Sequence, residues 1–156
     1  MKHFFLLPAF LIFLAACQEP ATDKNSASAT EESLSPEEAQ EDSLFKEMMS
    51  IHDEVMPKMD NIMRLKRSLR QKIDSLQQTQ TQTNIPTDSL QQLVQDLEEA
   101  DDAMMNWMRS NDFEFEGMSH EEIMEELRTE RENIIVVREK MLNSIEQAQQ
   151  ALEQIR

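Results

Sequence analysis

The chain has few of the residues that build phosphate loops, aromatic platforms and disulfides. Its 156 residues include one glycine, one cysteine, one tryptophan and no tyrosine. The single glycine, Gly117, excludes a glycine-rich loop that cradles phosphates. The scarcity of aromatic residues excludes a row of side chains that stack on nucleic-acid bases. Two sequence patterns on which nucleotide and nucleic-acid binding depend are therefore missing.

Basic residues are also scarce. There are 15 lysines and arginines against 31 aspartates and glutamates, which gives a formal net charge of −16. This charge repels nucleic acids and anionic lipid headgroups, so neither is an expected binding partner. The chain is instead rich in Glu, Gln, Leu, Met and Lys, which favour helices. The composition predicts an all-α protein with one domain and a modest core.

The N-terminus has the composition of a bacterial export signal. Lys2 carries the only charge among the first sixteen residues, and an apolar run extends from Phe4 to Ala16. A positive start, a short apolar stretch and small residues before a cleavage site define such signals. The run is too short for a stable transmembrane helix, which needs about 20 residues. We therefore expect residues 1–16 to be a signal peptide.

The LAAC box of residues 14–17 ends on Cys17, the only cysteine of the chain. This box resembles the lipobox of bacterial lipoproteins, and the resemblance implies cleavage before Cys17 and lipidation of its thiol, with palmitate as a typical acyl chain. Several acyl chains anchor a protein essentially permanently in a lipid bilayer. Inner-membrane lipoproteins typically have an aspartate directly after the lipidated cysteine. This chain has Gln18 there, which favours the outer membrane. The expected location is the cell envelope, facing the periplasm or the cell surface.

The segment after the cysteine predicts a tether. Residues 17–34 are small and polar and show no apolar period, which is typical of disordered chain. A tether of this length holds the next domain about 20–25 Å from the bilayer. Residues 35–156 form the predicted helical domain.

The helical domain begins with a capping box formed by Ser35 and Glu38. A seven-residue apolar period then predicts a coiled-coil seam, formed by Met48, Val55, Ile62, Leu69 and Leu76. Pro57 interrupts this stretch without changing the phase of the period. We expect one long helix over 36–79, kinked at Pro57 on its outer face. A four-helix bundle folded back at Pro57 is the alternative.

Two further helices complete the domain. The first is predicted over 88–110, with one apolar face formed by Leu90, Leu93, Leu97, Ala100, Met104 and Trp107. The second begins at the capping box of Ser119 and Glu122 and continues to the C-terminus. Its seam is again spaced by seven: Leu127, Ile134, Met141, Ala148 and Ile155. These helices predict an elongated up-down-up three-helix bundle, with segment 111–118 extended and with a core thin enough for a homo-oligomer to complete it.

Two segments carry a resemblance beyond the N-terminus. Residues 52–71 (HDEVMPKMDNIMRLKRSLRQ) and 100–108 (ADDAMMNWM) are similar to small lipoproteins of Bacteroidota, some of which are labelled "viral A-type inclusion protein". The resemblance extends over most of the chain beyond Cys17. It implies a helical lipoprotein and transfers no activity to any residue.

No catalytic residues are expected. The sequence from His120 begins like the HExxH helix of zinc proteases, but Met124 occupies the position of the second histidine. A thioether is a poor zinc ligand, so His120 is interpreted as a solvent-facing residue of the first helical turn. We therefore expect a protein that is not an enzyme.

Methionine is unusually frequent, with 12 residues in the chain. One stripe has spacings of three and four residues and consists of His52, Met56, Met59 and Met63. In the predicted bundle this stripe faces Met104 and Met108 of the following helix. Clustered thioethers with a histidine are typical of a soft Cu(I) site. Methionine also fills irregular cores and packs against aromatic edges. Both interpretations remain open on the sequence alone, and no other cofactor is expected.

Together these features favour a membrane-anchored, non-enzymatic helical interaction or scaffold module of the cell envelope. Its partners would be proteins that bind by helix packing. A methionine-rich Cu(I)-binding envelope protein is the alternative function.

Overall fold

The computed structural model describes residues 34–79 and 84–155. The predicted signal peptide, Cys17 and all of the predicted tether except Leu34 lie outside the described residues. The elements, in chain order, are α1 (Pro36–Val55), the 3-10 turn η1 (Met56–Lys58), α2 (Met59–Thr79), α3 (Thr87–Ser110) and α4 (His120–Gln154).

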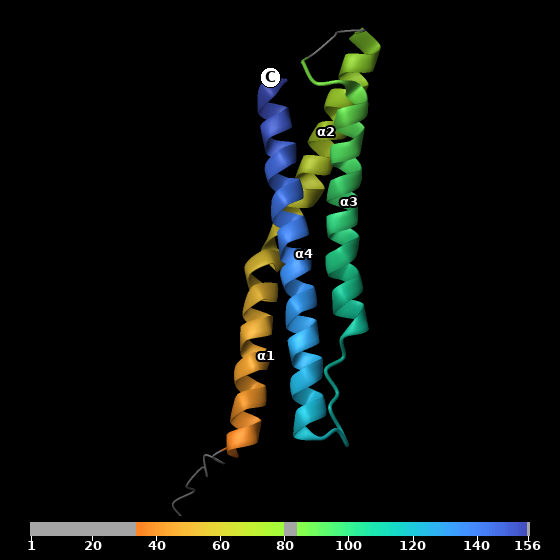
Figure 1. Cartoon of the computed structure of the whole chain (residues 1–156). Helices are drawn as coiled ribbons and strands as arrows, with labels where there is room; N and C mark the ends of the chain where they lie inside the picture. The colour runs from red at the N-terminus through yellow and green to blue at the C-terminus, as the bar shows by residue number, and fades with distance from the viewer. Residues whose placement is uncertain (1–33, 80–83, 156) are drawn as a thin grey trace, which may run out of the picture. The chain divides into compact units, whose positions relative to one another are not determined.

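The helices form an up-down-up bundle. α1 and α2 run in one direction, α3 returns beside α2, and α4 runs in the direction of α1 (Figure 1). α1 packs against α4, α2 packs against α3, and α3 packs against α4. The predicted all-α three-helix bundle with a long first and a long third rod is confirmed. The alternative fold is not observed, because α2 continues beyond α1 instead of folding back along it (Figure 1).

The first rod is not one continuous helix. The helix predicted over 36–79 is broken by η1, because Pro57 has no backbone N–H to donate to the preceding turn and its ring would clash with that turn. Pro57 is exposed, so the break lies on the predicted outer face. The seam keeps its phase across the break: Val55 and Ile62, seven residues apart, are both fully buried.

Both predicted capping boxes are present. The Ser35 hydroxyl accepts from the Glu38 backbone N–H at 3.2 Å, and the Ser35 N–H donates to Glu38 Oε2 at 2.7 Å. Ser119 and Glu122 form the same reciprocal pair at the start of α4. α3 begins at Thr87, directly after Pro86 and one residue before the predicted start.

The predicted seams form the core. All five seam residues of the first rod and all five of α4 are buried. On α3, five of the six predicted residues are buried, and Leu93 is half-buried. The period of seven missed several core residues that flank the seams, namely Val94, Val137, Ile145 and Ala151. They are buried because α3 contacts both α2 and α4, and α4 contacts the three other helices, so each buries a face wider than one seam.

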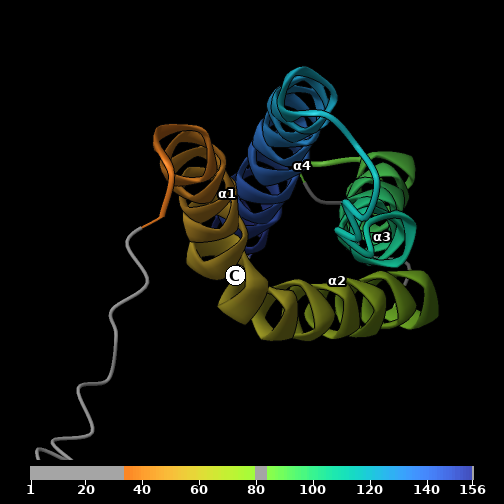
Figure 2. The same cartoon turned by 90° about the horizontal axis from the view of Figure 1, so that it is seen from below.

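α3 ends at Ser110, well before the start of α4, and the connecting segment takes its place in the core. Phe113 and Phe115 are half-buried, whereas Glu114 and Glu116 are exposed, which is the alternation of an extended chain. The Phe113 ring contacts Phe45 of α1 edge to face, with 5.3 Å between the centroids. Seen from below, α1 and α3 lie on opposite sides of α4, and the segment leads from α3 to α4 (Figure 2). The segment thus continues from α3 towards the start of α4 as predicted, but it is extended only in part, because residues 116–117 form a turn and Phe113 has a positive φ.

Candidate functional site

Two ion pairs set the antiparallel register between α2 and α3. Lys66 Nζ lies 3.1 Å from Asp101 Oδ2, and one turn later Arg70 pairs with Glu98. Counting back along both helices from these pairs places Met59 opposite Met108. The methionines of both helices therefore lie at neighbouring levels of the bundle.

The predicted copper-site residues at these levels have different surroundings. Met104 is fully buried in the core, whereas Met63 on α2 is 48% exposed. The Met63 sulfur also lies 3.8 Å from the ammonium group of Lys66. The other three methionines are half-buried and pack against the core: Met56, Met59 and Met108. A site that used all six residues would need rearrangement, because these methionines do not share one environment.

His52, the sixth residue of the set, lies near the end of α1. Its ring stacks on Trp107 of α3, with 5.7 Å between the ring centroids and 29° between the planes. His52 Nδ1 lies 2.9 Å from Asp53 Oδ1. Since an ionised carboxylate can only accept, Nδ1 donates to Asp53 and the remaining ring nitrogen, Nε2, is the acceptor. Such a carboxylate contact commonly orients histidines that bind metals.

Trp107 joins His52 to the phenylalanines. Its ring centroid lies 5.9 Å from that of Phe113, which in turn lies 6.4 Å from Phe115. Every aromatic residue after residue 16 belongs to this cluster, which joins α1, α3 and segment 111–119. Phe113 has a φ of +53°, an uncommon conformation for a bulky residue. The Trp107 Nε1–H is buried and has no hydrogen-bond partner among the described residues.

His120 does not face solvent as the sequence interpretation expected. Its Nδ1 lies 2.7 Å from Glu41 Oε1 of α1, and both side chains are 21% exposed. The interpretation missed this contact because it placed His120 from its own helix alone, and Glu41 precedes it by 79 residues. The pair fixes the start of α4 against α1 and leaves no arrangement like that of a zinc protease.

The interface of α1 and α4 is flanked by further charges. Arg131 pairs with Glu47 at 2.5 Å, and Arg138 pairs with Glu54 at 2.9 Å. Both partners advance by seven residues, so these pairs flank the seam as charges do in a parallel coiled coil. These pairs could be predicted from the shared period of the two seams, once the parallel packing was known.

The capping glutamates have perturbed acidity. Hydrogen bonds from the Ser119 backbone N–H and then from its hydroxyl hold the pKa of Glu122 below its ordinary value of 4.5. Ser35 lowers the pKa of Glu38 in the same order of causes. Both carboxylates are exposed parts of helix starts, and their perturbation reflects capping.

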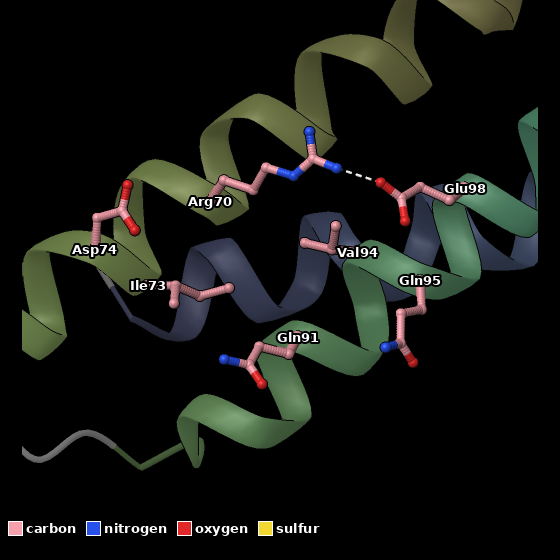
Figure 3. Close-up of a pocket in the computed structure, with 7 residues that line it drawn as sticks. All are labelled: Arg70, Ile73, Asp74, Gln91, Val94, Gln95 and Glu98. Atoms are coloured by element: carbon pink, nitrogen blue, oxygen red, sulfur yellow. Dashed lines mark hydrogen bonds and ion pairs between the residues drawn. The ribbon is translucent and has the colours of Figure 1, made fainter.

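The grooves of the bundle surface are shallow and lie between neighbouring helices. One of about 320 Å³ lies between α2 and α3 and is lined by Arg70, Ile73, Asp74, Gln91, Val94, Gln95 and Glu98. The Arg70–Glu98 ion pair crosses one end, and α4 lies behind the two helices (Figure 3). Its lining consists of one ion pair, one further carboxylate, two amides and two aliphatic side chains, so the groove offers docking contacts and no nucleophile paired with a base.

Within the described residues, no group of three or more histidine, cysteine or acidic side chains could hold a metal ion. None of the described helices combines the length and apolarity needed to cross a membrane. Comparison with known proteins finds no similarity: no family model, no curated protein and no solved structure matches the chain.

Proposed function

We propose that this chain is a lipid-anchored protein of the bacterial cell envelope whose helical bundle binds other proteins and catalyses no reaction. The LAAC box that ends at Cys17 carries the proposal, because it follows a positive residue and a short apolar run. The small polar segment 17–34 then connects the lipid to the start of α1. The likeness of 52–71 and 100–108 to small Bacteroidota lipoproteins supports the same placement, and Gln18 supports the outer membrane.

The bundle supports the interaction role through its surface. Its grooves are open and lie between helices, and charged residues flank them. Helical proteins bind one another by laying an apolar stripe of one helix into such a groove. We therefore propose a scaffold or adaptor that is held at the membrane and recognises partners by helix packing.

The anchor is tested by Cys17→Ser in cells that express the full chain. We expect this substitution to abolish labelling by a palmitate analogue and to leave the protein uncleaved or in the soluble envelope fraction. The reason is that serine cannot form the thioether through which the lipid is attached. Labelling that persists in Cys17→Ser would reject the anchor and the location together.

A matched control moves the thiol out of the box. The double variant Cys17→Ser, Ala21→Cys keeps one cysteine in the chain but places it four residues further on. We expect this chain to remain unlabelled, since cleavage and lipidation are specific to the cysteine of the box. Labelling at position 21 would mean that any exposed cysteine is acylated and that the LAAC box carries no information.

A second candidate function is Cu(I) binding at the end of the methionine stripe. Its supporting observation is that Asp53 accepts from His52 Nδ1, which leaves Nε2 available as a ligand. The half-buried Met59 and Met108 lie opposite each other and could supply thioethers, which Cu(I) prefers. Met104 is a weaker candidate because it is buried in the core, and Met63 is weaker because its sulfur contacts Lys66.

Copper binding is tested by anaerobic Cu(I) titration with Trp107 fluorescence as the readout, since Trp107 is the only tryptophan and stacks on His52. We expect saturable quenching near one equivalent, and weaker binding in Met59→Leu and Met108→Leu. These swaps conserve core volume and normally cost less than about 1.5 kcal/mol of stability. Quenching that is absent at micromolar copper, or equal in all variants, would leave the methionines with a packing role.

A further inference from the structure

α2 and α3 lie side by side with α4 behind them, so each helix has a side that is turned away from α4 (Figure 3). The position of this surface follows from the Arg70–Glu98 ion pair, which bridges the two helices there. Met63 lies seven residues before Arg70, and Met105 lies seven residues after Glu98, so each occupies the same side of its helix as the ion pair. Arg67 and Asp102 are their neighbours at spacings of three or four residues. We call this surface the α2–α3 face.

Apolar side chains are exposed on this face near the start of α2 and the end of α3. Met63 is 48% exposed and Met105 is 39% exposed. The register of the two helices puts Met63 opposite position 104, so the two methionines lie at one level. Flexible thioether side chains are common at surfaces that bind other proteins. The pair therefore supplies the apolar contact that a docking surface needs.

α2 and α3 differ in their overall charge. α2 carries five basic and two acidic side chains, whereas α3 carries six acidic and one basic. Lys66 and Arg70 are neutralised by α3 within the chain. Among the described residues, the exposed Arg67 and Asp102 have no ionic partner. On the face itself, α2 presents Arg67 between the carboxylates of Asp60 and Asp74, and α3 presents Asp102 followed by Arg109.

We propose that the α2–α3 face binds the same face of a second copy of the chain, about a two-fold axis parallel to the helices. Rotation about this axis exchanges the two sides of the face and keeps the height along the bundle. α2 of each copy then lies against α3 of the other, so that opposite charges meet. A two-fold axis across the helices would instead set α2 against α2, which would separate Arg67 from Asp102 and Met63 from Met105.

The order of signs along the helices supports the parallel arrangement. Arg67 is level with position 100 of α3, and its counterpart in the second copy is the carboxylate of Asp102. Near the start of α2 the signs reverse: Asp60 is level with Trp107, and its counterpart is Arg109. The same two-fold rotation thus satisfies both charged contacts, and it brings Met63 of each copy to Met105 of the other.

This inference rests on the proposed function in one respect, because a parallel pair is the arrangement that two chains anchored in one membrane can adopt. The tether of each copy joins the start of its α1, and the parallel axis keeps both starts at the same end of the pair. The second copy is thereby the first partner that we assign to the interaction module.

The contact is tested by disulfide cross-linking in cells that express the full chain. Two differently tagged chains, Met63→Cys and Met105→Cys, are produced together and oxidised, and dimers are resolved by non-reducing electrophoresis. We expect the mixed 63–105 disulfide to exceed both homotypic disulfides several-fold. Homotypic disulfides of equal yield, or the absence of any disulfide, would overturn the proposal. Val136→Cys on α4 is the matched control, since Val136 is 64% exposed and lies outside the face.

Charge reversal tests the arrangement independently. We expect Arg67→Glu to reduce the yield of the mixed disulfide about tenfold, because two carboxylates then face each other at each contact. Adding Asp102→Arg in the same chains should restore the yield, since the contact is then reversed in sign on both sides. A yield that neither substitution changes would overturn the parallel two-fold contact. Circular dichroism checks that the helices remain intact in each variant.

The outcomes also separate this inference from the anchor. Fractionation of the same cells reports whether the chain is held at the membrane. Membrane-bound chains without the 63–105 disulfide reject the paired face alone. Soluble chains that still form the disulfide reject the anchor alone and leave the paired face in place.

Discussion

Methionine occupies two different environments in this protein. Met48, Met104 and Met141 are fully buried, whereas Met63 and Met105 are among the most exposed large apolar residues that the structure describes. An unbranched thioether tolerates both environments, since it fills irregular gaps in a core and adapts to a partner at a surface. The residue type alone therefore does not separate packing from binding, and the exposure of each side chain has to be known.

Lys66 shows how far a charged residue can enter the core when its partner is positioned. Lys66 is about as buried as the neighbouring apolar residues of the seam, and its ammonium group pairs with the carboxylate of Asp101. A buried ammonium group is costly without a paired carboxylate. The period of seven identified Ile62 and Leu69 on either side of it. It could not identify Lys66, because the carboxylate that makes its burial possible lies 35 residues away on another helix.

The lowered pKa of Glu122 predicts a measurable pH dependence. The stabilisation from its carboxylate is complete above the ordinary pKa of 4.5 and is lost as the pH falls through the lower pKa of the folded state. Glu122→Gln keeps an acceptor for the Ser119 N–H but does not titrate. We therefore expect urea unfolding of this variant to depend less on pH below 4.5 than that of the parent chain.

The adjacent Glu121→Gln is the control for this prediction. Glu121 lies in the same exposed first turn, but the structure gives it no capping hydrogen bond. Its substitution changes the charge of the turn without touching the capping box. If Glu121→Gln and Glu122→Gln flattened the pH dependence equally, the effect would come from net charge at the helix start, and the capping box would not be its source.

The break between α1 and α2 gives the first rod two different neighbours. α1 packs against α4, whereas α2, which follows the turn η1, packs against α3 (Figure 1). A straight helix over the same residues could not follow both. Pro57 lies in the first positions of η1, where a missing N–H costs little.

This position reverses the effect expected for Pro57→Ala. From the sequence, the substitution would restore a hydrogen bond of a continuous helix and raise stability. In the bent rod, alanine mainly gives the unfolded chain more freedom, so we expect a loss of about 0.4–1 kcal/mol in the free energy of unfolding. Urea denaturation measures the change. A gain in stability would contradict this expectation and would mean that the restored helical hydrogen bond outweighs the packing that the bend allows.

The bundle as a whole is unevenly supported along its length. α2, α3 and α4 pack against one another, whereas α1 packs mainly against α4 and the segment 111–119. Between Pro36 and Glu47 no residue of α1 is buried. Stability within a protein follows the density of such buried contacts. The start of α1, which follows the predicted tether, is therefore the least supported part of the described bundle.

Hydrogen exchange should report this difference. We expect amides of 36–47 to exchange at least about tenfold faster than amides in the middle of α4, whose seam residues Ile134 and Met141 are fully buried. Exchange followed by mass spectrometry resolves the two segments. Equal protection would mean that a contact outside the described chain covers α1. The α3 amides, which lie in a helix of similar length to α1, serve as the internal reference.

Most of the fold could be predicted from local and periodic signals. Ser35 with Glu38, and Ser119 with Glu122, identified two helix starts, since a capping box uses residues only three positions apart. The seams through Val55 and Ile134 followed from apolar periodicity, which a single helix contains in full. The course of 111–118 followed from the unequal lengths of the helices. Each of these inferences depends on residues that are close in the chain.

The sequence by itself thus determined the helices, their buried faces and their up-down-up order. Only the tertiary structure decided which side chains meet across helices. It paired Lys66 with Asp101 and His120 with Glu41, stacked His52 on Trp107, and left Met63 and Met105 exposed. The physical reason is that the rotation and axial register of packed helices are set by all contacts of the core together. A side chain's surroundings therefore depend on residues that its own helix does not contain.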